Sequence, residues 1–300
     1  MIKIILLVLI CFQSFSLIPN DCDLKGISEL PTLAGGRIKP TNVLAKESLK
    51  FIFQQKPKLA ASKLLCLLSL NKGQEYIPQL SIKAEHKRLW SFFSVDKSKG
   101  IPIEKALTSI RDLRLEYQQN KDDSSYRKEI NKVLFRIDQF QKITTGETWN
   151  LWFENDWRPI NQLRNVSLNQ LQKSLDSFNS NDLSKTKIEF IFDKISPFTW
   201  SILVTLLSIL FLFSLKSIIV PMSLAILSVS LQSLGMFARV YISGRAPITN
   251  MYETVMFSGL GALILCLFIY SYKKNKVFLY TGLFYNICLL YTSPSPRDRG

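Results

Sequence analysis

The chain has 300 residues, of which 47% are hydrophobic, and a formal net charge of +15. The lysines are scattered among acidic residues instead of gathered on one face, so we exclude nucleic acid as a partner. From Pro197 onward the sequence is almost continuously apolar, whereas residues 20–195 are polar and rich in lysine. This division predicts a mainly α-helical protein in which a soluble domain precedes a polytopic membrane domain.

Residues 1–19 have the three parts of a secretory signal peptide. Lys3 supplies a positive start, Ile4–Phe12 is an apolar core, and small residues follow at a plausible cleavage site. An uncleaved anchor helix is the alternative, and either one places the following segment outside the membrane. Cys22 and Cys66 are a candidate disulfide pair there, although their spacing leaves the pairing open.

Residues 20–195 are expected to form a mainly helical exported domain. The range 124–143 repeats apolar residues at helical spacing and predicts a long helix, and Thr41 is a suitable N-cap for another. We interpret the aromatic cluster Trp149–Trp157 as packing within this domain. His86 is the only histidine, and we interpret it as solvated because a metal site needs partner ligands.

Residues 197–287 are predicted to form the membrane domain. We expect three full spans, at about 198–215, 218–242 and 252–270, and a truncated fourth span at 277–287. Lys216 and the lysines at 273, 274 and 276 then lie on one side of the membrane, which is the inside because positive loops stay inside. Residues 20–195 and the segment between the second and third spans lie outside.

Residues 288–300 are interpreted as a non-native tail. The stretch Cys288–Asp298 resembles the translation of a transposase adapter used in DNA library preparation. Its Ser-Pro-Ser-Pro-Arg-Asp sequence is incompatible with the end of a bilayer span. We therefore expect the native sequence to stop near Ile287 here and to continue in the complete protein.

A polar stripe runs along the second predicted span. Ser228, Gln232, Gly235 and Arg239 follow one another at helical spacing and lie on one face. One interpretation is that the stripe faces the bundle interior or a cavity and is functional. The other is that Ser228 bonds its own backbone and Arg239 extends to the outer headgroups.

The segment between the second and third spans concentrates the remaining candidates. Asn250 can cap the third span, and Glu253 is favourable in its first turn. Arg245, together with Tyr252 and Glu253, is suited to binding an anionic group such as a carboxylate. The candidate binding set is therefore Gln232, Arg239, Arg245, Asn250, Tyr252 and Glu253. We identify no catalytic residue and no metal ligand.

Two stretches resemble one protein family. The first, Gly244-Arg-Ala-Pro-Ile-Thr-Asn250-Met-Tyr252-Glu253 followed by Phe257, looks like the opening motif of the CcsA membrane domain of System II cytochrome c synthesis. The second, Leu30-Pro-Thr-Leu-Ala-Gly-Gly36-Arg37-Ile-Lys39-Pro40-Thr-Asn-Val-Leu44-Ala45-Lys-Glu47, resembles the "GR-K-PLDT-ARE" stretch of the exported region in CcsA-like and fused CcsBA proteins. Both occur in the expected order and on the side that the predicted topology gives them.

The resemblance implies a multi-spanning protein of the bacterial inner membrane that presents haem at the outer face for covalent attachment to apocytochrome c. It also implies holocytochrome c synthase activity and a CcsB/ResB-type partner or fused region. Family members carry a W-G-x-x-W-x-W-D haem loop flanked by histidines. The cluster Trp149–Trp157 differs in spacing and precedes the spans, so we do not carry the haem site onto this chain.

Two other functions remain open. A transporter or exporter subunit with an exported sensing domain would have paired broken helices in two halves. A non-catalytic assembly factor would use its exported domain to dock a partner. The sequence beyond Ile287 distinguishes these from a haem-handling protein, which requires the haem loop and its histidines.

Overall fold

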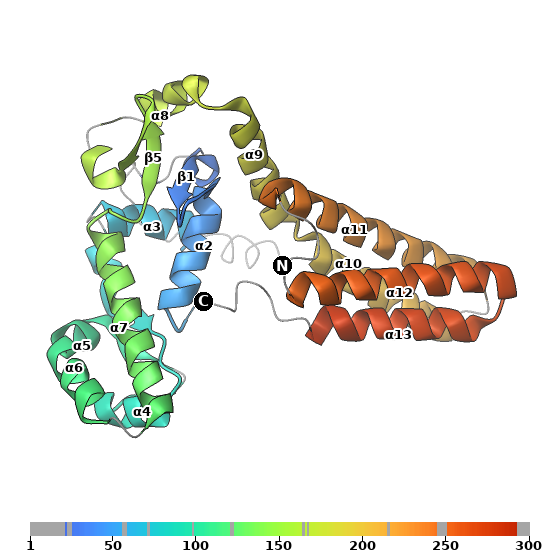
Figure 1. Cartoon of the computed structure of the whole chain (residues 1–300), viewed down its shortest axis with the longest axis horizontal. Helices are drawn as coiled ribbons and strands as arrows, with labels where there is room; N and C mark the ends of the chain where they lie inside the picture. The colour runs from blue at the N-terminus through green and yellow to red at the C-terminus, as the bar shows by residue number, and fades with distance from the viewer. Residues whose placement is uncertain are drawn as a thin grey trace, which may run out of the picture. The chain divides into compact units, whose positions relative to one another are not determined.

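The computed structural model describes residues 22, 26–55, 59–70, 73–97, 99–120, 123–163, 166, 168–214, 217–244 and 251–292. The fold is mainly helical, as the sequence predicts (Figure 1). It divides into two compact units, the first formed by residues 1–30 and 48–176 and the second by residues 31–47 and 177–300. The predicted leader, residues 1–19, and residues 293–300 of the predicted tail lie outside the described residues.

The first unit is a set of short helices with two small antiparallel strand pairs. Its helices are α3 (Ala61–Ser69), α4 (Lys87–Phe93), α5 (Ile103–Thr108), α6 (Ile110–Gln119), α7 (Ser124–Thr144) and α8 (Leu168–Ser174). Its 3-10 turns are η2 (Ile27–Glu29), η3 (Gln74–Gln79) and η4 (Ile160–Leu163), and η5 (Leu175–Ser177) follows where the two units meet in the chain. β3 (Ser81–Ile82) pairs with β4 (Ile101–Pro102), and β5 (Asn150–Phe153) pairs with β6 (Asp156–Pro159).

The long helix α7 forms the centre of this unit's core. Asp123 caps it by accepting a hydrogen bond from the backbone N–H of Tyr126 at 3.0 Å. The face that carries Ile130, Val133 and Ile137 is buried, and α7 packs against α3, α6 and β3. The helix predicted at 124–143 is confirmed, because its apolar period of 3.6 residues matches one buried face.

The tryptophan cluster forms a β-hairpin that helical patterning does not predict. Glu154 and Asn155 take the left-handed conformation, with φ of 51° and 63°, and make the two-residue turn between β5 and β6. The rings of Trp152 and Trp157 meet edge to face with centroids 5.4 Å apart, and Trp149 is 2% exposed. Trp152 and Trp157 therefore pack on each other, and Trp149 contributes to the core.

A disulfide joins Cys22 to Cys66 on α3, with the two Cα atoms 5.9 Å apart. The structure therefore shows that Cys22 and Cys66 are bonded to each other, which their spacing in the sequence leaves open. It ties the segment before β1 to α3, whose residues 64–68 are all buried.

The second unit combines a small hairpin with the apolar helices. β1 (Pro31–Ala34) pairs with β2 (Arg37–Pro40) through a turn in which Gly35 and Gly36 have φ of 59° and 72°. Glycine adopts positive φ with less strain than other residues do, which explains the Gly-Gly sequence. α2 (Thr41–Ile52) follows directly, and its first seven residues belong to this unit. The remaining helices are α9 (Ser180–Ile195), α10 (Pro197–Ser214), α11 (Ile219–Ser243), α12 (Met251–Lys273) and α13 (Lys276–Thr292).

Within the part of the chain that the structure describes, three helical segments are long and apolar enough to cross a membrane, in agreement with the predicted spans. The first, Ser180–Ser214, contains the charged helix α9 and the apolar helix α10, and the others lie in α11 and α12. α13 is a shorter apolar helix. It runs five residues beyond Ile287, since the helix breakers of the predicted tail begin only at Pro294.

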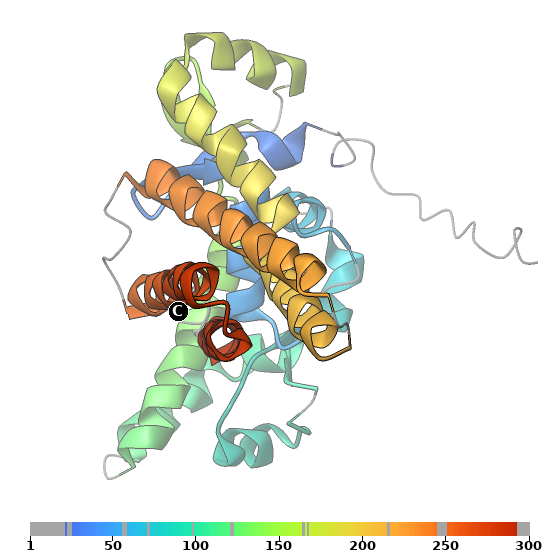
Figure 2. The ribbon, with the colours of Figure 1, turned by 90° about the vertical axis from the view of Figure 1, so that its right-hand side faces the viewer.

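The apolar helices form two antiparallel hairpins, α10–α11 and α12–α13, that pack together (Figure 2). Leu212 near the end of α10, Ala225 in α11, Tyr270 in α12 and Leu279 in α13 belong to one buried cluster. Tyr280 adds a hydrogen bond of 3.0 Å to the carbonyl oxygen of Leu212. The end of α10 and the start of α11 thus lie at the same end of the bundle as the end of α12 and the start of α13, and Lys216 lies outside the described residues.

Candidate functional site

Two carboxylates on α9, those of Glu189 and Asp193, face the β1–β2 hairpin and the start of α2. Their four-residue spacing places them on one face of the helix, and their side chains are 11% and 3% exposed. Arg37 on β2 forms an ion pair with Glu189. Charge pairs therefore join the hairpin to the helix that leads into the first span.

Asp193 has two donors from α2. Its Oδ2 atom accepts a hydrogen bond from Nδ2 of Asn42 at 3.0 Å and one from Nζ of Lys46 at 2.5 Å. Asn42 and Lys46 are four residues apart, so both reach the same carboxylate from one face of α2. A nearly buried carboxylate needs such donors, because an unpaired buried charge costs several kcal/mol, by rough estimate.

The environment of Glu189 stabilises its ionised form less well than the environment of Asp193 does. Burial raises the pKa of Glu189 above its ordinary value, and the Arg37 guanidinium opposes that rise only in part. Glu47 adds to the rise by like-charge repulsion, although Glu47 is itself paired with Lys39 at 2.7 Å. The carboxylates of Glu189 and Asp193 thus occupy different electrostatic environments, although both face the β1–β2 hairpin and α2.

Arg239 lies near the end of α11, beside the break between α9 and α10. Its guanidinium carbon is 5.6 Å from the ring centre of Phe198 and 5.9 Å from that of Phe192. The two rings flank Ser196, which ends α9 in the left-handed conformation with φ of 49°. Cation–π contacts of this kind attach α11 to the point where the chain turns into the first span.

Gly235 allows this contact to form. A Cβ atom at Gly235 would lie 2.9 Å from Cζ of Phe198 and 3.3 Å from Cγ of Pro197. No side chain fits in that space, so α10 approaches the backbone of α11 directly. The predicted polar stripe therefore includes one position that is required for packing.

Ser228 and Gln232 belong to a buried hydrogen-bond network that joins three helices. The Ser228 hydroxyl lies 2.6 Å from Thr205 Oγ1 and 3.2 Å from Ser201 Oγ, both on α10. Nε2 of Gln232 donates to Ser228 Oγ at 3.1 Å and to Oδ1 of Asn286 on α13 at 3.1 Å. Nδ2 of Asn286 donates back to Oε1 of Gln232 at 3.1 Å.

The stripe thus faces the bundle interior at Ser228 and Gln232, which is the first of the two interpretations of the sequence. The network groups satisfy one another, so they are suited to fixing the register of the helices. Arg239 packs on aromatic rings at the end of the same face. Gln232 and Arg239 therefore belong to two separate clusters on α11.

The structure describes only part of the predicted binding set. Arg245 and Asn250 lie outside the described residues. Tyr252 belongs to the first turn of α12, but its side chain is outside the description. Glu253 follows it, half-buried, in the same turn.

Sequence reasoning missed Glu189, Asp193 and Asn286 as site residues. Two acids four residues apart on the helix before a span are a detectable signal, because they suggest a face turned away from lipid. Asn286 is an amide within an apolar run, which carries the same implication. Their partners, however, are distant in sequence and had no local signal.

Within the described residues, no group of three or more His, Cys, Asp or Glu side chains is placed to hold a metal ion. His86 caps α4, and its Nδ1 accepts a hydrogen bond from the backbone N–H of Arg88. Its ring also packs on Tyr126, with centroids 5.1 Å apart. His86 is therefore engaged in local structure and is not a ligand candidate.

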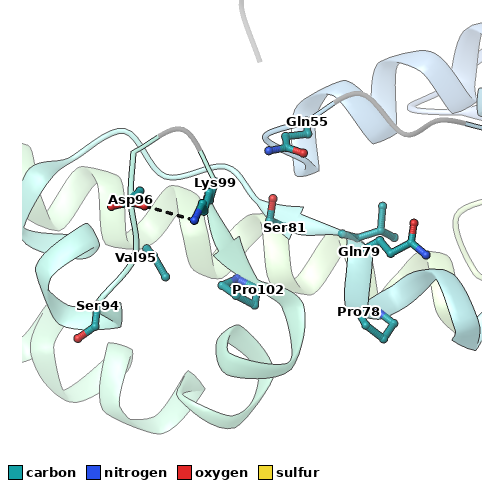
Figure 3. A pocket seen from close by; sticks show the side chains of 11 residues that line it. Gln55, Pro78, Gln79, Ser81, Ser94, Val95, Asp96, Lys99 and Pro102 are labelled. Carbon is teal, nitrogen blue, oxygen red and sulfur yellow. Dashed lines mark ion pairs between the residues drawn. The ribbon is translucent and has the colours of Figure 1, made fainter.

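The first unit contains a cavity of about 340 Å³ beside β3 and β4 (Figure 3). Pro78, Leu80, Val95 and Pro102 contribute apolar side chains to its lining, and amide, hydroxyl and charged side chains complete it. The rim charges, Asp96 and Lys99, pair with each other at 3.6 Å. This lining shows no acid–base pair suited to catalysis.

Comparison of the chain with known protein families and with curated proteins found no match.

Proposed function

We propose that this chain is a haem-handling membrane protein of the CcsA type, which supports covalent attachment of haem to apocytochrome c. Residues 20–195 would lie on the outer side of the bacterial inner membrane. The apolar helices would anchor the site, and a CcsB/ResB-type partner or fused region would complete it.

The observation that carries the proposal is that both resembling stretches belong to one compact unit. Residues 31–47, which contain all but the first residue of the upstream stretch, group with residues 177–300, which contain the stretch that begins at Gly244, although almost 200 residues separate them. Within this unit Arg37, Asn42 and Lys46 pair with the helix that precedes the first span. Such pairing links the upstream stretch to the helix that precedes the apolar spans, which supports a joint role of the two stretches at one membrane face.

The disulfide between Cys22 and Cys66 supports the exported location. Structural disulfides form and persist in oxidising compartments such as the space outside the bacterial inner membrane. The predicted leader leads to the same location by an independent argument.

The described residues do not supply an axial ligand set for haem iron. The single histidine of the sequence caps α4, and two of the five cysteines are bonded to each other. We therefore derive no chemical step through haem in this chain. The proposed contribution of its own residues is to build the outer vestibule, to which Arg245, Asn250, Tyr252, Glu253, Arg239 and Gln232 would contribute. Thioether formation itself would belong to the haem and the cysteine thiols.

The test uses the complete gene, with the reading frame continued beyond Ile287, in a bacterium that lacks its own cytochrome c synthesis. Co-expression with a reporter apocytochrome c should yield covalently haem-stained protein and co-purified haem. Arg245→Ala should lower both, whereas Arg114→Ala, on the exposed face of α6, should leave both unchanged. A continuation without the W-G-x-x-W-x-W-D loop, together with no haem in the purified protein, would instead indicate a transporter subunit or an assembly factor.

A further inference from the structure

The helix α9 separates its charges between two opposite faces. The carboxylates of Glu189 and Asp193 are buried and turned toward the hairpin. The opposite face carries two exposed lysines and two isoleucines that are 52% and 51% exposed: Lys187, Lys194, Ile191 and Ile195. At 100° per residue these four positions span about 100° of the helix surface, so they form one mixed basic and apolar stripe.

α9 directly precedes the apolar helix α10, so with α10 spanning a membrane this stripe would lie next to the membrane surface. α9 ends at the left-handed residue Ser196, and α10 leaves it in a different direction (Figures 1 and 2). Trp200, in the first turn of α10, is 56% exposed. Tryptophan at the start of an apolar span typically marks the level of the lipid headgroups.

The stripe is short enough to stay at that level. Lys187 and Ile195 are separated by about 12 Å along the helix axis. Because α9 changes direction at Ser196, the stripe extends beside the start of the span instead of continuing along its axis. Among the residues that the structure describes, Lys187 and Lys194 form no ion pair, so their charges are available to an external anion.

We propose that the outward face of α9 binds anionic phospholipids in the outer headgroup layer. Lys187 and Lys194 would contact the lipid phosphates, and Ile191 and Ile195 would enter the boundary between headgroups and acyl chains. The surface is continuous along the chain with exposed apolar residues of α10, including Leu203 and Leu207. A lipid surface therefore fits this face better than a protein partner does, and the inference is independent of the proposed haem function.

The experiment uses the purified full chain in bilayers, with Ile191→Cys labelled by an environment-sensitive fluorophore. Cys266→Ala and Cys288→Ala remove the two cysteines of the apolar helices, which lie outside the Cys22–Cys66 disulfide. Acyl-brominated phosphatidylglycerol should quench the label more strongly than acyl-brominated phosphatidylcholine, and aqueous iodide should quench it weakly. Lys187→Gln with Lys194→Gln should reduce the preference for phosphatidylglycerol by roughly fivefold for each lysine.

Lys185→Gln is the matched control, because it makes the same charge change on α9 at a lysine that lies 3.7 Å from Asp182. It should leave the lipid preference unchanged. Circular dichroism of each variant checks that the helices are retained. Strong iodide quenching, equal quenching by the two lipids, or an equal loss in Lys185→Gln would overturn the proposal.

Discussion

Gln232 on α11 and Asn286 on α13 exchange two hydrogen bonds of 3.1 Å each in the interior of the apolar bundle. Both residues are 1% exposed or less. Such a reciprocal amide pair holds two helices in one register, because any slip leaves four polar groups without partners in an apolar environment.

Gln232→Leu should destabilise the bundle by about 1–2 kcal/mol, since it leaves the Asn286 amide unpaired. Thermal unfolding in detergent, followed by circular dichroism, measures this loss. Adding Asn286→Leu should recover part of it, because the unpaired group is then removed. Ser230→Ala, at an exposed position of α11, is the control and should change little. Strictly additive losses in the double variant would contradict the pairing.

Gly235→Ala should destabilise the packing of α10 on α11 by about 1–3 kcal/mol, because the new Cβ would lie 2.9 Å from the Phe198 ring. Gly261→Ala provides a matched comparison in α12, where no atom lies within 4 Å of the added Cβ. The two melting temperatures in the same detergent measure the difference. Equal shifts of the melting temperature in both variants would show that the Phe198 ring does not pack closely against Gly235.

Asp193→Asn should loosen the attachment of α2 to α9, since it removes the charge that Lys46 pairs with. We expect a loss of about 1–3 kcal/mol and faster hydrogen–deuterium exchange in residues 41–47. Asp182→Asn, at a partly exposed ion pair of the same helix, should leave that exchange unchanged. Unaltered exchange in Asp193→Asn would show that the ion pair between Asp193 and Lys46 does not hold α2 against α9.

Glu189→Gln should behave differently from Asp193→Asn. Burial raises the folded-state pKa of Glu189 above its unfolded value. Between these two pKa values the folded protein therefore binds more protons than the unfolded protein does. Its contribution to stability is therefore fully present below the unfolded pKa of about 4.3 and is lost as pH rises through the folded pKa. At neutral pH the Glu189→Gln substitution should lower the free energy of unfolding only slightly. The variant should also lack the change in stability that the titration of Glu189 causes. Urea unfolding between pH 4 and pH 8 tests both outcomes, and a large loss at pH 7 would oppose them.

Cys22→Ser should destabilise the first unit by about 2–4 kcal/mol, because the disulfide to Cys66 closes a segment of 44 residues. In the exported protein Cys22 and Cys66 should resist alkylation until a reductant is added, as mass spectrometry of peptides would show. Retention of both thiols in the reduced form in exported protein would contradict the proposed location.

Local patterns in the sequence were sufficient for the long helices. The helix at 124–143 and the apolar helices were predictable because each has a buried or lipid-facing pattern longer than ten residues. The β1–β2 and β5–β6 hairpins were not predicted, since their strands are four residues long and show little alternation. The Gly35-Gly36 turn was recognisable, but the turn at Glu154 and Asn155 was not, because non-glycine residues seldom adopt positive φ.

The sequence by itself determined that this protein has three helices apolar enough to cross a membrane and a polar stripe along the second, because hydrophobicity and helical period are local properties. Only the tertiary structure decided that Asp193 pairs with Lys46, that Asn286 completes the Gln232 network, and that Gly235 admits the Phe198 ring. These relationships join segments that are distant in the chain. They depend on which faces the helices present to one another, and no local pattern encodes that choice.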